Sequence, residues 1–396
     1  MMRLFVLIIT SFLSVTSVWA QTESNGEKIN PEKKTENEIS RLSIGGYSQI
    51  DFNQPIGGGA YHNGTLDVHR MVLLFGYKFN ERAQFISEIE LEHINEVSVE
   101  QAFLNYRMLP WFNFRGGLML IPMGIINENH EPPTYNGVER PNVDYKIVPS
   151  TWRELGAGFT GVFTDISLKY QVYLVNGFKS YDGTTAYLDG VNGLRNGRQK
   201  GIESFVSSPN LTAKIDYFGL PGLEVGLSGY FGKTQSSLFN NLKKDYLAGK
   251  ARADSSVVGV NMFGIDARYN KKGWELRAQY IATYIKKSES YNKFSGNDLG
   301  SQMNGWYIEA GYNLFLLIPD MESQLVPFVR YEKYNTQHKT EGNLLANLSN
   351  DKTEITAGIG WRITSALVIK SDYQWRKSAE NSDNTGQFNL GIGLMF

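Results

Sequence analysis

The sequence contains no cysteine among its 396 residues. This absence excludes disulfide frameworks, thiolate catalysis, Cys-ligated zinc sites and iron–sulfur clusters. A surplus of positive charge is missing too, because 39 Lys and Arg face 40 Asp and Glu and leave a formal net charge of −1. A nucleic-acid partner would need an excess of positive charge to meet its phosphate backbone, so we expect none.

Long hydrophobic runs are missing as well, except near the start of the chain. Residues 1–20 combine a basic start, a short apolar stretch and a small-residue end, which is typical of a secretory signal peptide. An uncleaved anchor is the alternative, but the apolar stretch is short for a membrane span. Residues 21–41 carry almost no large apolar side chains and are predicted to be a flexible periplasmic leader. Residues 42–396 are predicted to form one folded unit.

Apolar and polar residues alternate throughout residues 42–396. In the last segment Phe388, Leu390 and Ile392 are apolar, and polar or small residues separate them. Only an extended strand converts a period of two into one apolar and one polar face. The pattern predicts sixteen strands, at residues 42–52, 66–79, 83–93, 97–108, 112–123, 154–163, 166–176, 210–218, 223–231, 259–269, 274–285, 304–314, 325–334, 354–363, 367–376 and 387–396.

The connections between these strands follow a pattern of their own. Most that follow even-numbered strands are short and turn-like, whereas those after odd-numbered strands are usually longer, as at 124–153 and 177–209. Outer-membrane barrels show this asymmetry, and a soluble sandwich gives no reason for it. We therefore predict an all-β protein, a 16-stranded antiparallel transmembrane β-barrel with short periplasmic turns and long extracellular loops. It would be exported to the bacterial outer membrane and surrounded by lipid.

The face opposite the apolar residues is charged with both signs, ten cations against eleven anions where the phase is clear. A sixteen-stranded barrel is wide enough to leave an aqueous lumen, in which such charges stay hydrated. The sequence thus predicts a water-filled passage for small hydrophilic solutes and inorganic ions. The predicted pore-lining cations are Arg70, Lys78, Lys169, Lys214, Arg268, Arg277, Arg330, Arg362, Lys370 and Arg376.

The connection 124–153 is long and rich in proline and charge. Loops of this length in a compact fold usually have a function or are disordered, and the prolines favour a stiff excursion. Our hypothesis is that this loop folds into the lumen as the constriction; an ordinary surface loop is the alternative. The candidate constriction residues are Glu128, Glu131, Arg140, Lys146 and Arg153.

Three short segments resemble the phosphate-selective porin family of the O and P type. The run 117–124 (GLMLIPMG) is similar to its Gly-Gln-Phe-Lys-x-Pro-Phe-Gly segment, 152–156 (WRELG) to the Arg-x-x-Gly of its sixth strand, and 174–177 (LVNG) to the Asn-Gly ending its seventh. The resemblance implies a homotrimeric channel that uses Lys and Arg to pass anions such as phosphate. Leu118 and Leu120 replace the family's Gln and Lys, so the residues themselves predict only passage of small polar solutes.

No arrangement in the sequence predicts an enzyme, a cofactor or a metal site. Gly156–Gly161 matches G-x-G-x-x-G, but it lies within a predicted strand and precedes another strand, whereas a dinucleotide site needs a helix there. The five histidines lack metal-ligand spacing, and no Ser–His pair is singled out. The alternative function is a non-channel barrel that acts as an adhesin or surface docking platform.

Overall fold

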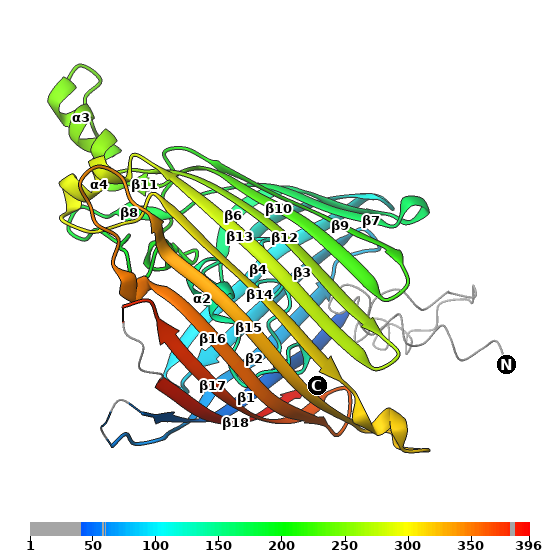
Figure 1. The fold of residues 1–396 in the computed structure, drawn as a ribbon. Coiled ribbons are helices and arrows are strands. Elements are labelled where there is room, and N and C mark those ends of the chain that lie inside the picture. Colours follow the sequence, from blue (N-terminus) through cyan, green and yellow to red (C-terminus); the bar gives the residue numbers. More distant parts are fainter. Residues whose placement is uncertain (1–40, 58, 60, 381–384) are drawn as a thin grey trace, which may run out of the picture. The chain divides into compact units, whose positions relative to one another are not determined.

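The computed structural model describes residues 41–57, 59, 61–380 and 385–396. The predicted signal peptide, and the predicted leader up to residue 40, lie outside them. Sixteen strands form one closed antiparallel barrel (Figure 1). They are β1 (Leu42–Ile56), β2 (Thr65–Lys78), β3 (Ala83–Glu92), β4 (Glu96–Leu109), β5 (Phe112–Leu120), β6 (Arg153–Phe163), β7 (Leu168–Val175), β9 (Asn210–Leu220), β10 (Leu223–Lys233), β12 (Gly259–Lys271), β13 (Trp274–Lys286), β14 (Gln302–Tyr312), β15 (Gln324–Lys339), β16 (Asp351–Arg362), β17 (Leu367–Ser378) and β18 (Thr385–Met395).

Each barrel strand pairs with the one before and after it in the chain, and β18 closes the ring against β1. The closing register runs from Tyr47 opposite Met395 to Ile56 opposite Gly386. Closure removes the edge strands whose backbone groups would otherwise lack partners in lipid. The predicted fold class is confirmed, and each predicted strand corresponds to one barrel strand. The largest difference is at β15, which continues to Lys339 because its end pairs with β14 beyond the membrane-length segment.

The two ends of the barrel differ as predicted. One end, here called the turn end, carries short connections such as 79–82, 110–111 and 272–273. The opposite end, the loop end, carries the long connections 121–152, 176–209 and 234–258. Aromatic side chains beside the turns are exposed on the outer face, as expected for rings at headgroup level: Trp111, Tyr217, Phe218, Trp274 and Trp361.

The connections that leave the loop end hold most of the small elements. They are β8 (Lys179–Tyr181) and β11 (Gln235–Ser236), which pair in parallel, the helices α2 (Asn142–Lys146), α3 (Leu247–Ser255) and α4 (Ser288–Ser295), and the 3-10 turns η1 (Pro132–Thr134), η3 (Arg195–Gly197), η4 (Ser237–Phe239) and η6 (Leu348–Asn350). Two further 3-10 turns, η2 (Thr164–Ile166) and η5 (Leu314–Leu317), lie at the turn end. None of the helices in the described ranges is long and apolar enough to cross a membrane.

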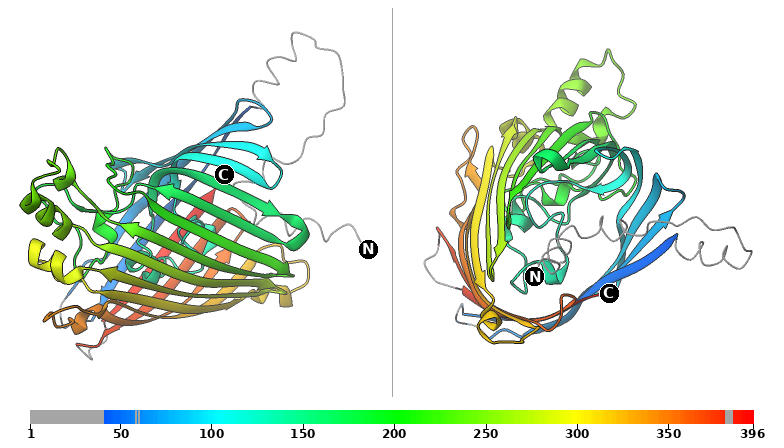
Figure 2. Two further views of the ribbon diagram at one scale, coloured as in Figure 1. Left: turned by 90° about the horizontal axis from the view of Figure 1, so that it is seen from above. Right: turned by 90° about the vertical axis from the view of Figure 1, so that its right-hand side faces the viewer.

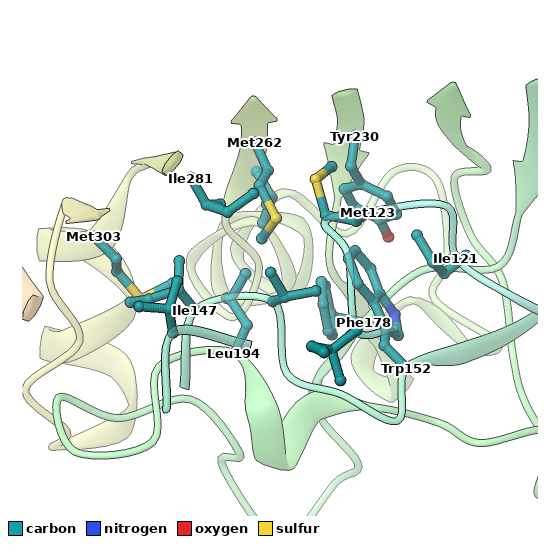
Figure 3. Packing of buried hydrophobic residues seen from close by; sticks show 14 of the residues in the cluster. Ile121, Met123, Ile147, Trp152, Phe178, Leu194, Tyr230, Met262, Ile281 and Met303 are labelled. Carbon is teal, nitrogen blue, oxygen red and sulfur yellow. The ribbon is translucent and has the colours of Figure 1, made fainter. Parts of the chain in front are cut away.

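A hydrophobic core lies inside the barrel, and Figure 3 shows the part of it that lies against β10 and β12–β14. Trp152 stacks on Phe178 with ring centroids 4.5 Å apart and contacts Tyr230 at 4.7 Å. Met262 on β12 and Ile281 on β13 are fully buried against this cluster. The alternation predicted an inward face that contacts water throughout. The structure differs on this side, because long connections fold onto inward apolar residues and exclude water.

Candidate functional site

The candidate site is the segment 121–152, which leaves β5, runs inside the barrel and returns at β6. The right-hand view of Figure 2 shows it as the cyan-green coil within the ring of strands. Asn127 joins the two ends of the segment. Its side-chain amide donates to the carbonyls of Ile121 (2.7 Å) and Trp152 (2.9 Å). The Asn127 side-chain oxygen accepts from the Trp152 backbone N–H at 2.7 Å. One buried Asn thus bonds to three backbone groups of the two chain ends, which also pair directly through the Ile121 N–H and the Trp152 carbonyl at 3.0 Å.

The first part of the segment is bound to the wall at β9 and β13. The Lys214 ammonium donates to the carbonyl of Gly124 at 2.8 Å, and the side-chain oxygen of Gln279 accepts from the backbone N–H of Ile125 at 2.7 Å. Lys214 also forms an ion pair with Glu128 at 3.2 Å. Gly124 has φ +70, and a Cβ there would lie 2.7 Å from the Gln279 oxygen. Glycine is therefore required where the segment leaves the wall.

The middle of the segment carries a buried charge cluster. His130 Nε2 lies 3.2 Å from Glu100 on β4 and 3.8 Å from Glu88 on β3. Burial alone would lower the pKa of His130, but the charge and hydrogen bond of Glu100, supported by Glu88, raise it to about 10. His130 is therefore an imidazolium at neutral pH, and it attaches the segment to β3 and β4.

The far part of the segment reaches the opposite wall. The Lys370 ammonium on β17 donates to the carbonyls of Tyr135 (2.7 Å) and Gly137 (2.8 Å). On the same strand, Asp372 accepts from the backbone N–H of Val138 at 2.6 Å. Asn53 on β1 donates to Glu139 at 2.8 Å. The segment thus spans the lumen from β9 to β17 and β1.

The returning part is α2, held by β15 and β16. Glu332 on β15 accepts from the backbone N–H of Val143 at 3.1 Å, and Asn142 donates to Glu354 on β16 at 2.8 Å. Both carboxylates thus lie at the N-terminal end of the short helix, where backbone N–H groups are unpaired. Two wall carboxylates therefore hold the returning part of the segment.

The ten predicted pore-lining cations all lie on barrel strands, but the segment covers several of them. Arg70, Lys214, Arg330 and Lys370 are at most 4% exposed. Arg330, for example, lies between Glu309 (3.4 Å) and Glu332 (3.3 Å). The expectation of hydrated charges is therefore wrong for these four. Lys214, Arg330 and Lys370 are covered by the segment that they bind, and Arg70 is buried beside His69 and Glu90 on the wall.

The remaining six predicted cations are half-buried. Ion pairs with acids on the wall join Lys169 to Asp216, Arg268 to Glu224, Arg277 to Glu309, Arg362 to Glu275 and Arg376 to Glu354. Lys78 lies at the turn end of β2. Because these pairs neutralise the wall locally, the wall itself offers little net positive field.

The predicted constriction residues do not form a single ring. Glu128 lies at the β7–β9 wall, where Gln171 and Lys214 donate to it. Arg153 lies at the β4 wall with Glu100 at 3.8 Å, and Glu131 is buried. Arg140 donates to the carbonyl of His130 at 2.9 Å, and Lys146 donates to Asn192 at 3.2 Å.

Three further cations lie next to the returning part of this segment. They are not among the predicted pore-lining residues. The Arg195 guanidinium donates to the carbonyl of Tyr145 at 3.1 Å and lies 3.4 Å from the centre of its ring. Arg198 donates to the carbonyls of Pro149 (2.9 Å) and Thr151 (3.0 Å). With Lys200 they line a hollow of 420 Å³, together with Thr185, Ala186, Tyr187, Asp189 and Asn196. We call Arg195, Arg198 and Lys200 the mouth cations.

The mouth cations repel one another. Burial, and then the neighbouring charges of Arg195 and Arg153, lower the pKa of Arg198 to about 9. Burial, and then Arg198 and Arg153, also lower the pKa of Lys200. A bound anion would relieve this repulsion. The run 195–200 (RNGRQK) holds three cations and no acid, and this signal was present in the sequence.

Comparisons with known proteins relate the barrel to outer-membrane porins. The anion-selective porin from Comamonas acidovorans matches with a TM-score of 0.57 and 10% identity over 90% of this chain and 99% of that one. The outer membrane channel DcaP of Acinetobacter baumannii matches with a TM-score of 0.56 and 11% identity over 90% and 97%. At these identities the similarity shows the fold alone. The narrower phosphate-selective resemblance stays a prediction.

Sequence comparison gives a nearer relative. No protein-family model matches the chain. A protein of Aquifex aeolicus (strain VF5), described as uncharacterized, is 31% identical over 364 residues, which cover 87% of this chain and 77% of that protein. The chain is therefore a porin-fold barrel that belongs to the same family as this Aquifex protein.

Proposed function

We propose that the protein is an outer-membrane channel of the porin class, through which small polar solutes and ions diffuse passively. The observation that carries the proposal is the segment 121–152, held inside a closed sixteen-stranded barrel by bonds to opposite walls. Such a segment narrows the passage through the lumen without blocking it. We expect a homotrimer in lipid, because an outer membrane protein of Vibrio cholerae with this fold, OmpT, is described in a trimer form.

We further propose that the channel favours anions, including phosphate. Ion pairs neutralise much of the positive charge on the wall, whereas the mouth cations lie together on the long connection 176–209. A local excess of positive field raises the concentration of anions at an entrance. The resemblance to the phosphate-selective family supports this choice. Because Leu118 and Leu120 replace its polar residues, selectivity would arise at the mouth of the channel and not along β5.

Planar-bilayer recording tests both proposals. Purified protein should give stable single-channel steps, and the reversal potential in a KCl gradient should shift toward that of chloride. Phosphate should reduce the chloride current. Replacing the mouth cations together (Arg195→Gln, Arg198→Gln, Lys200→Gln) should bring selectivity close to neutral. The matched control replaces Lys243, Lys244 and Lys250, which lie on the separate connection 234–258, and should keep the anion preference.

A silent bilayer at adequate protein concentration would instead favour a surface docking platform. Two features of the structure support this second candidate function. The segment 121–152 contacts walls on several sides, and the hydrophobic core excludes water from part of the lumen. In addition, α3 carries Leu247 76% exposed beside an exposed Tyr246, on the connection 234–258.

A further inference from the structure

Three potential metal ligands meet at the loop end of β2 and β3. The Nδ1 atom of His93 contacts Oδ2 of Asp67, and Nδ1 of His69 lies 3.7 Å from the same oxygen. The two imidazole rings meet edge to face with centroids 5.3 Å apart. One ligand atom from each residue lies within 4.8 Å of the others. The spacing of the histidines did not predict this group, because most of β2, a turn and the whole of β3 separate His69 from His93 in the chain.

A β-bulge places His69 toward the lumen. In the pairing of β1 with β2, Gln49 lies opposite Arg70 and Ile50 opposite Val68, so His69 is the extra residue. Bulges re-aim a side chain in this way. The inward direction follows from contacts: the guanidinium of Arg70, itself buried and paired with Glu90 at 3.4 Å, lies 3.0 Å from His69 Nε2.

A strained turn brings His93 over the same point. His93 has φ 51 and Ile94 φ 62, and the N–H of Asn95 donates to the carbonyl of Glu92 at 3.2 Å. Tight hairpin turns with two positive φ values usually contain Asn or Gly. A non-glycine pair in this conformation costs conformational energy, and such strain gathers at functional sites. The His93 backbone N–H donates to the carbonyl of His69 at 3.2 Å, which keeps the two side chains opposite each other.

The donor set matches a borderline transition-metal ion. Two imidazole nitrogens and one carboxylate oxygen suit Zn²⁺, Ni²⁺ and Cu²⁺, whereas Ca²⁺ and Mg²⁺ prefer more oxygen ligands. The side chains of His69, Asp67 and His93 are 27%, 25% and 50% exposed, so an ion can enter and water can complete its coordination. We propose that Asp67, His69 and His93 form a binding site for a divalent transition-metal ion at the rim of the barrel.

Loading the site requires one rearrangement. Arginine only donates hydrogen bonds, so its contact with His69 Nε2 places the His69 hydrogen on Nδ1. Coordination through Nδ1 moves that hydrogen to Nε2, and Arg70 then releases the ring and keeps Glu90. The other carboxylate–histidine group, Glu88, Glu100 and His130, is different: it is sealed from solvent, and its imidazolium is already hydrogen-bonded to Glu100.

Calorimetric titration of the folded barrel in detergent, without a polyhistidine tag, tests the site. ZnCl₂ should bind with one ion per chain. His69→Ala and His93→Ala should each weaken binding at least tenfold, because each removes one of three protein ligands. Asp67→Asn, which keeps the shape of the side chain, should also weaken it. His338→Ala, an exposed histidine on β15, is the matched control and should bind as the wild type does.

Cobalt(II) provides an independent readout, because its visible absorption reports nitrogen ligation directly. We expect a wild-type absorption band that is lost in His93→Ala and kept in His338→Ala. Absence of Zn²⁺ binding by the wild type would overturn the proposal, as would unchanged affinity in both histidine variants. Altered electrophoretic mobility on heating identifies folded barrels; if an alanine variant fails to fold, Asp67→Asn decides in its place.

Discussion

Single residues explain why the lumen segment stays in place. His130 is a cation buried between two strands, and its partners Glu100 and Glu88 are buried with it. Lys370 and Asp372 form hydrogen bonds directly with the backbone of the same segment. Buried charges are costly unless paired, so each of these groups stabilises the segment only while its partner is present.

His130→Gln should destabilise the folded barrel by about 3 kcal/mol at neutral pH, since removing one partner leaves buried carboxylates unpaired. The pKa of His130 is raised in the folded state from 6.5 to about 10. Its contribution is therefore complete below pH 6.5 and is lost as the pH rises through 10. Urea unfolding in detergent between pH 6 and 11 should show the two proteins converging at the alkaline end. A difference that stays constant with pH would contradict the ion pair, and His338→Gln serves as the control.

Gly177→Ala should destabilise the barrel by roughly 2 kcal/mol. Gly177 has φ +85, and a Cβ there would meet the side-chain amide of Asn210 at 1.7 Å. Positive φ and a steric clash each cost energy for any residue with a side chain. The expected result is a lower temperature for the change in electrophoretic mobility. Gly360→Ala on β16, where the nearest atom is 3.9 Å away, should leave that temperature nearly unchanged.

At the scale of elements, the barrel strands are determined by local sequence, and the lumen segment 121–152 is determined by long-range contacts. Each barrel strand follows from local alternation, because a period of two defines an outward and an inward face wherever the strand pairs. The path of the segment 121–152 follows instead from bonds to strands far along the chain. Its prolines and charges predicted a stiff, functional loop. They did not predict that Lys370 and Asp372 bind its backbone, because these residues are separated from it by more than two hundred positions.

Deleting residues 128–146 should raise single-channel conductance, because the deleted stretch includes the contacts to β15, β16, β17 and β1. Recording in planar bilayers measures the change. We expect an increase of about twofold or more in current per channel, since most of the segment that crosses the lumen is removed. A shorter control deletion of residues 243–251, on the exposed connection that carries α3, should leave the current as in the wild type. Unchanged current in the first variant would refute the constriction.

At the scale of the molecule, closure connects the first strand to the last. Within the described residues, β1 pairs with β18 across nearly the whole length of the barrel sequence, and this pairing satisfies both free edges together. A barrel of this length is assembled from local hairpins, so closure is the long-range step. In lipid, an open edge would leave many backbone groups unpaired at several kcal/mol each.

Removing residues 385–396 deletes β18 and should therefore abolish the folded barrel. β1 and β17 would both lose their partners, and β17 cannot replace β18 without shifting the entire ring. The expected result is a protein whose electrophoretic mobility no longer changes on heating. Substituting Gly393 by Ala within the same strand tests a milder change, because a Cβ would meet Pro132 at 2.4 Å. A truncated protein that still shows a folded species would contradict closure by β18.

The sequence by itself determined the sixteen strands, their outward faces and the difference between the two barrel ends, because these depend on local alternation and turn residues. It also held the run of mouth cations, although composition alone gave no reason to choose it. Only the tertiary structure decided which inward charges are buried beneath the lumen segment and which stay accessible. It also decided that Asp67, His69 and His93 meet. The physical reason is that barrel closure and loop folding bring together residues from distant strands, and no local pattern records such distances.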